Sequence, residues 1–84
     1  LDDDEHGDLQ QYLINDPEAG DIIPGSGGVR KLRWQRQGMG KRGGIRIIYY
    51  VMKKHDELWM LTLYAKSLHD NIPAHIVRAM KERF

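Results

Sequence analysis

The chain has 84 residues, 40% of them hydrophobic and 30% charged, which is enough for one domain with a modest core. It contains no cysteine, which excludes a disulfide framework, a cysteine-ligated zinc site and a thiol nucleophile. No apolar run approaches the roughly 18 residues of a membrane helix, and no signal-peptide pattern is visible. These features predict a single cytoplasmic domain over residues 1–84, without a membrane partner.

The first segment predicts a helix. Leu9, Tyr12 and Leu13 follow the helical spacing. The acidic run 2–5 lies where the helix dipole favours negative charge, and Pro17 ends the helix because the residue before a proline leaves the α region. Residues 22–28 are expected to form a loop, since they combine proline with several glycines.

Three strands are predicted next, over residues 29–36, 45–52 and 58–64. The middle strand is almost entirely apolar, which indicates burial on both faces. Short connections make the three strands an antiparallel meander.

A C-terminal helix is then expected. Asn71 can cap it and Pro73 lies in its first turn, while an apolar stripe is made by Ile76, Val77, Met80 and Phe84. The order of elements predicts an α+β fold with both helices against one face of the sheet and the other face free. Trp34 and Trp59 are expected in the core.

The net charge of +1 hides two blocks of opposite sign. Residues 1–21 contain eight acidic and no basic side chains, a charge of −8, whereas residues 22–55 contain nine basic and no acidic ones, a charge of +9. Such a split favours a polyanionic partner for the basic block. The alternative is that the two blocks neutralise each other within the fold.

Motifs for common cofactors are weak. Residues 38–43 match G-x-G-x-x-G, but a strand follows them where a dinucleotide site needs a helix. We interpret this segment as a hairpin loop whose Lys41 and Arg42 can reach a phosphate, or as a plain turn with solvated charges. The four histidines show no metal-ligand spacing, so neither a metal nor another cofactor is expected.

A cationic surface is the strongest functional feature. Lys31 and Arg33 share a face of the first predicted strand, Arg46 begins the second, and Tyr64 and Lys66 end the third. In a meander these side chains converge on one concave surface. Cations on a sheet, together with a tyrosine, suit single-stranded RNA better than duplex DNA. The alternative interpretation is protection of edge strands by charge, which explains Arg46 poorly because its strand is central.

Residues 20–34, 40–50 and 61–66 together make the chain resemble the RelE/HigB toxins of bacterial toxin–antitoxin pairs, most closely the HigB-like branch. The resemblance implies a fold like that of small microbial ribonucleases. Family members usually begin with a further strand before the first helix, which we expect the chain as given to lack. The resemblance also implies a ribosome-dependent mRNA endonuclease that needs no metal and is inhibited by a cognate antitoxin, expected to be of the helix-turn-helix type.

By position, the resemblance assigns the catalytic roles to Lys31, Arg33, Arg46, Tyr64 and Lys66. Other basic residues of the same blocks are expected to bind RNA, namely Arg30, Arg36, Lys41 and Arg42. Arginines would stabilise the phosphorane, while a lysine or Tyr64 would move protons. Many RelE-type members place a catalytic tyrosine near the C-terminus, and none follows Lys66 here, so the general acid and base stay unassigned.

Three alternatives remain open. A ParE-like toxin would inhibit DNA gyrase and cut no RNA. A plain RNA- or ribosome-binding module would bind in a salt-sensitive manner and leave the message intact. Finally, the chain as given could be an inactive piece of an active enzyme.

Overall fold

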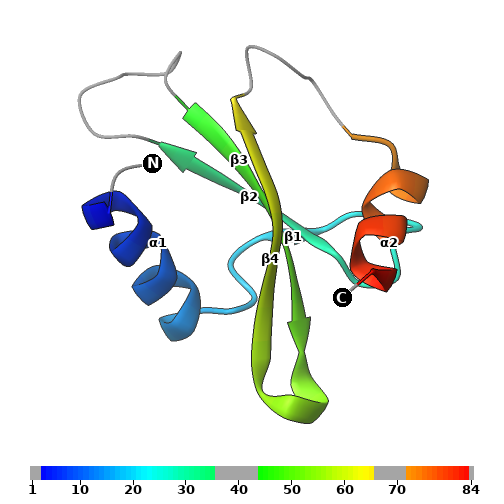
Figure 1. The fold of residues 1–84 in the computed structure, drawn as a ribbon, viewed down its shortest axis with the longest axis horizontal. Coiled ribbons are helices and arrows are strands. Elements are labelled where there is room, and N and C mark those ends of the chain that lie inside the picture. The colour runs from blue at the N-terminus through cyan, green and yellow to red at the C-terminus, as the bar shows by residue number, and fades with distance from the viewer. Residues whose placement is uncertain (1–2, 36–43, 66–71, 84) are drawn as a thin grey trace.

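The computed structural model describes residues 3–35, 44–65 and 72–83 (Figure 1). It is an α+β fold with a helix near each end of the chain and an antiparallel sheet between them, as the sequence predicts. The elements in chain order are α1 (Asp3–Asn15), β1 (Asp21–Ile22), β2 (Arg30–Gln35), β3 (Gly44–Met52), the 3₁₀ turn η2 (Lys53–His55), β4 (Glu57–Ala65) and α2 (Ala74–Glu82). No helix in these ranges is long and apolar enough to cross a membrane.

The sheet has the strand order β1-β2-β3-β4, with every neighbouring pair antiparallel. The meander of β2, β3 and β4 is therefore confirmed. The expected loop over residues 22–28 is partly wrong, because Asp21 and Ile22 form the additional strand β1 opposite Lys31 and Arg30 of β2. A buried serine makes this possible. Ser26 Oγ donates to the Ile23 carbonyl at 2.6 Å and accepts from Val29 N–H at 3.0 Å, which folds the chain back along β2.

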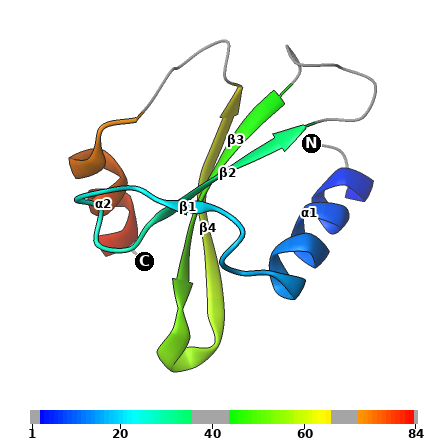
Figure 2. The ribbon, with the colours of Figure 1, turned by 180° about the vertical axis from the view of Figure 1, so that it is seen from behind.

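The two helices lie on opposite faces of the sheet, which corrects the expectation that one face is free (Figures 1 and 2). On one face, Leu9 and Leu13 of α1 pack in a cluster with residues of β2 and β3 that include Tyr49. On the other face, Val77 of α2 shares a cluster with Ile48. The physical reason is that β3 is apolar on both sides, so each side needs a helix to exclude water.

Helix α1 ends at Asn15, before Pro17, and carries its acidic residues in its first turn as expected. Helix α2 begins at Ala74, so Pro73 is at the N-cap position instead of in the first turn. Its apolar stripe is narrower than expected, since Val77 is fully buried while Ile76 is 40% exposed. Asn71 and Phe84 lie outside the described residues.

The tryptophans pack at the margin of the core, each half-buried against a tyrosine. Trp34 meets Tyr12 edge to face, with ring centroids 5.6 Å apart, and Trp59 meets Tyr50 at the same separation. The expectation that both tryptophans lie in the core is thus only partly met, because both strands that carry them flank the central strand.

Tyr49 ties the segment after α1 to the middle of the sheet. Its side chain is fully buried, and its hydroxyl accepts from Gly20 N–H at 2.8 Å and donates to the Pro17 carbonyl at 2.8 Å. Gly20 has no room for a side chain, since a Cβ would lie 2.9 Å from both the Tyr49 hydroxyl and the Lys31 carbonyl oxygen. The hydroxyl thereby fixes the path of the chain into β1.

We predict that Tyr49→Phe lowers the free energy of unfolding by about 1–3 kcal/mol, because it leaves the buried Gly20 N–H without an acceptor. Tyr12→Phe is the matched control, since that ring is 45% exposed and keeps its packing against Trp34. Urea unfolding of the three proteins measures the effect. Equal stability of Tyr49→Phe and the parent would show that the two hydrogen bonds of the Tyr49 hydroxyl contribute nothing to the free energy of unfolding.

Alkaline pH provides a second test of the same contact. Burial raises the pKa of the Tyr49 hydroxyl above its ordinary value of 10.0, with hydrogen bonding from Gly20 opposing the shift. A raised pKa in the folded state means that the contribution is complete below pH 10 and is lost as the pH rises beyond it. Above pH 10, the melting temperature of the parent should therefore fall more steeply than that of Tyr49→Phe, and parallel curves would contradict this.

Candidate functional site

Three predicted site residues lie side by side across the sheet. Arg33 on β2 is the direct cross-strand partner of Arg46 on β3, which in turn is opposite Tyr64 on β4. Directly opposed residues project from the same face of a sheet, so the three side chains form one row across three strands. Tyr64 belongs to the cluster around Val77, which places the row on the face that α2 covers.

The row runs from solvent into the protein. Arg33 is exposed, whereas Arg46 and Tyr64 are each only 9% exposed and the Tyr64 hydroxyl itself is buried. A guanidinium group is seldom this buried unless an opposite charge accompanies it. Arg46 is therefore the unusual residue of the row.

Acidic side chains do not neutralise these arginines within residues 3–35, 44–65 and 72–83. Two ion pairs in these ranges lie away from the row, between Lys53 and Glu18 at 3.2 Å and between Arg78 and Glu82 at 3.5 Å. Like charges directly opposite each other on neighbouring strands repel, and a buried charge without a counter-charge costs free energy. Both effects favour an anion at the row.

The remaining predicted residues fall into three groups. Lys31 is opposite Ile48 on β3, so it shares the face of the row two residues along β2 from Arg33. Arg30 lies apart from the row, because its Nη1 donates to the Gly20 carbonyl at 2.7 Å and supports the segment before β1. The other predicted residues lie outside the described ranges, namely Arg36, Lys41, Arg42 and Lys66.

One contact that positions α2 over this face was missed in the sequence. Lys81 Nζ donates to the Gly27 carbonyl at 3.0 Å and lies 4.7 Å from the centre of the Tyr50 ring. A cation over an aromatic ring is attracted by its electron-rich face. No local pattern reveals this contact, because Lys81 and Gly27 are 54 positions apart.

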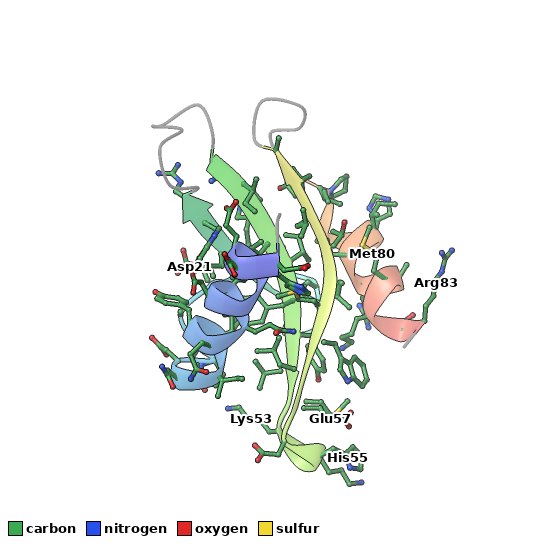
Figure 3. All side chains as sticks on the ribbon, turned by 60° about the vertical axis from the view of Figure 1, so that its left-hand side comes forward. Asp21, Lys53, His55, Glu57, Met80 and Arg83 are labelled. Atoms are coloured by element: carbon green, nitrogen blue, oxygen red, sulfur yellow. The ribbon has the colours of Figure 1, made fainter. Side chains whose placement is uncertain are left out.

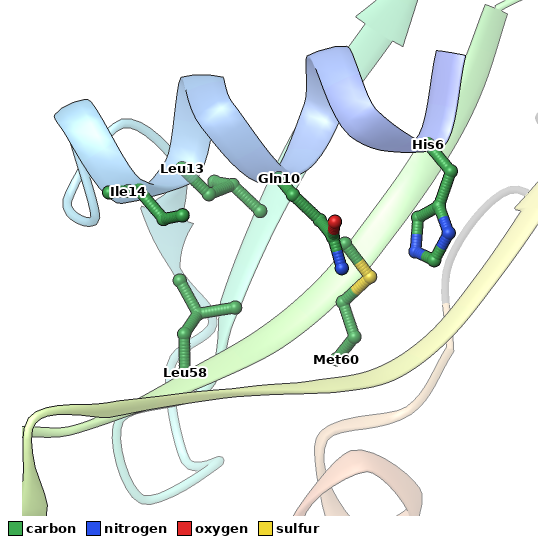
Figure 4. Close-up of a pocket in the computed structure, with 6 residues that line it drawn as sticks. All are labelled: His6, Gln10, Leu13, Ile14, Leu58 and Met60. Atoms are coloured by element: carbon green, nitrogen blue, oxygen red, sulfur yellow. The ribbon is translucent and has the colours of Figure 1, made fainter. Parts of the chain in front are cut away.

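The opposite face and the sheet edge contain two hollows. An open groove of about 450 Å³ lies between α1 and β4 (Figure 4), lined by His6, Gln10, Leu13, Ile14, Leu58 and Met60. A second hollow, of about 300 Å³, contains Glu18 and Lys53.

The hydrogen bond and the positive charge of Lys53, together with the charge of Arg30, lower the pKa of Glu18. Among the described residues no three His, Asp or Glu side chains are grouped to hold a metal ion.

No protein-family model matches the chain. The resemblance to the RelE/HigB toxins therefore stays a prediction from the three sequence blocks, while the row of Arg33, Arg46 and Tyr64 is an observation of the structure.

We predict that inorganic phosphate raises the melting temperature more than sodium chloride does at equal ionic strength. A bound anion stabilises only the folded state, by about 2.7 kcal/mol at a hundred times its dissociation constant. Arg46→Gln should abolish most of this difference. Arg78→Gln is the matched control, because Arg78 is an exposed arginine on α2. Equal responses of the parent and Arg46→Gln would show that phosphate binds elsewhere.

Proposed function

We propose that the chain is a toxin of a toxin–antitoxin pair that acts as a ribosome-dependent mRNA endonuclease of the RelE/HigB type. The observation that carries the proposal is the opposition of Arg33 and the buried Arg46 across neighbouring strands, with no acidic counter-charge among the described residues. A phosphodiester supplies the missing negative charge. The sequence resemblance supports RNA as its source.

The proposed reaction uses the RNA's own 2′-hydroxyl. Its oxygen attacks the adjacent phosphorus while the bond from phosphorus to the 5′ oxygen breaks, which leaves a 2′,3′-cyclic phosphate and a free 5′-hydroxyl. The proton of the 2′-hydroxyl passes to a general base, and another proton is donated to the leaving oxygen. The pentacoordinate intermediate carries extra negative charge, which fixed arginine donors stabilise.

The position of each residue suggests its role in stabilising the phosphate or in transferring protons. Arg33 and Arg46 face the phosphate from neighbouring strands. Tyr64, opposite Arg46, is the candidate proton donor or stacking group, and Lys31 on the same face is a candidate base. Lys66 remains the second candidate base. Because the ribosome would orient the message, the protein need not supply all of the positioning itself.

We expect Arg46→Ala to lower the rate of mRNA cleavage by about 10²- to 10³-fold, the usual cost of removing one donor to a developing negative charge. Mapping of mRNA 5′ ends in a translation extract measures cleavage, and growth arrest on induction measures toxicity. Arg78→Ala is the matched control, since Arg78 lies on the exposed side of α2 in an i,i+4 pair with Glu82.

Full toxicity and full cleavage by Arg46→Ala would contradict the assigned role of this residue. Gyrase inhibition in a supercoiling assay without cleavage of the message would overturn the nuclease proposal in favour of a ParE-like toxin. Salt-sensitive ribosome binding with an intact message would replace it with a plain binding module.

A further inference from the structure

Strand β4 lies at an edge of the sheet and lacks most of the usual protection of an edge strand. Exposed edges present unpaired N–H and C=O groups, and proteins protect them with short strands, charged residues or proline. The opposite edge is protected because its strand is short: β1 has only two residues. In contrast, β4 has nine residues, no proline, and Glu57 at its first position as its only charged residue. A bulge between Met60 and Thr62 is the one feature that interrupts it.

Apolar side chains accompany this edge on the side that faces α1. Leu58 and Met60 of β4 form one wall of the groove of about 450 Å³, and Leu13 and Ile14 of α1 contribute to the other (Figure 4). Ile14 is 68% exposed. Leu63 points to the same face, because it is opposite Ile47, and it is 43% exposed. The edge thus offers backbone pairing together with an apolar surface.

The charge distribution favours a second copy of the chain as the partner. The acidic first turn of α1 lies toward the end of the sheet at which β4 finishes (Figure 1). The basic turn η2, which contains Lys53, Lys54 and His55, lies at the opposite end, where β4 begins (Figure 3). A two-fold axis at the middle of β4 reverses one copy, so that the basic turn of each copy approaches the acidic turn of the other.

We propose that β4 pairs antiparallel with β4 of a second copy, with the two apolar grooves packed beside the joined strands. The pairing satisfies the backbone groups of both edges and buries Leu63 and Ile14. The axis is perpendicular to the joined sheet, so both rows of Arg33, Arg46 and Tyr64 lie on the same face, away from the grooves. This interface does not depend on the proposed nuclease activity.

Leu63→Lys tests the interface, because a lysine on the outer strand blocks edge pairing and its position is already exposed in the single chain. We expect the parent to sediment as a dimer at micromolar concentration. The variant contains two lysines per interface and should raise the dissociation constant by about a hundredfold or more. Ile22→Lys makes the same chemical change on the opposite edge, at a residue that is 55% exposed, and should leave the dimer intact.

A charge exchange tests the orientation of the two copies. Lys54→Glu should weaken the dimer at low salt, and adding Asp4→Lys should restore it, because the pair of charges is then reversed. A parent chain that is monomeric at every concentration overturns the proposal, as does a Leu63→Lys variant that remains dimeric or an Ile22→Lys variant that dissociates equally. Absence of rescue by Asp4→Lys overturns the antiparallel orientation.

Discussion

The proposed chemistry depends on one arrangement, in which Arg46 occupies the only charged position of a central strand and has another arginine directly across from it. Removing a guanidinium from water costs several kcal/mol unless it is paired. Here the neighbouring side chains on the row are a second cation and the phenol of Tyr64. A bound phosphodiester would offset this cost, which links the packing of the sheet to the proposed site.

The rest of the fold holds this arrangement in place. Helix α1 and Tyr49 close one face of β3, and helix α2 closes the other through Val77 and its Lys81 contact. The opposite charge blocks neutralise each other only in part. Glu18 pairs with Lys53 at the far end of the sheet, whereas the arginines of the row have no acidic partner among the described residues. Neutralisation within the fold is therefore seen for Glu18 and Lys53, while a polyanionic partner for the basic block stays a prediction.

Local sequence patterns predict those helices and strands that depend on interactions between residues near one another in the chain. The apolar run of β3, the spacing in α1 and the residue before Pro17 fix those elements, and alternation along the strands predicts that Arg33 and Arg46 share a face. Features that depend on distant residues were not predictable. The hydrogen bonds of Tyr49 reach back 29 and 32 positions, and the turn that places β1 beside β2 is held by hydrogen bonds of Ser26 and between Ile23 and Val29. The sequence also did not predict that the two helices pack on opposite faces of the sheet, because β3 is apolar on both of its faces.

The most direct measurement is an NMR titration of the arginine Nε–H signals with a short RNA that carries 2′-O-methyl groups and so cannot be cleaved. If the row is a phosphodiester site, the signals of Arg33 and Arg46 shift together, saturate at one RNA concentration and lose this response in high salt, while that of Arg78 stays fixed. Equal small shifts of all arginines, or a response of Arg78 without Arg46, would contradict the claim that the row is a phosphodiester site.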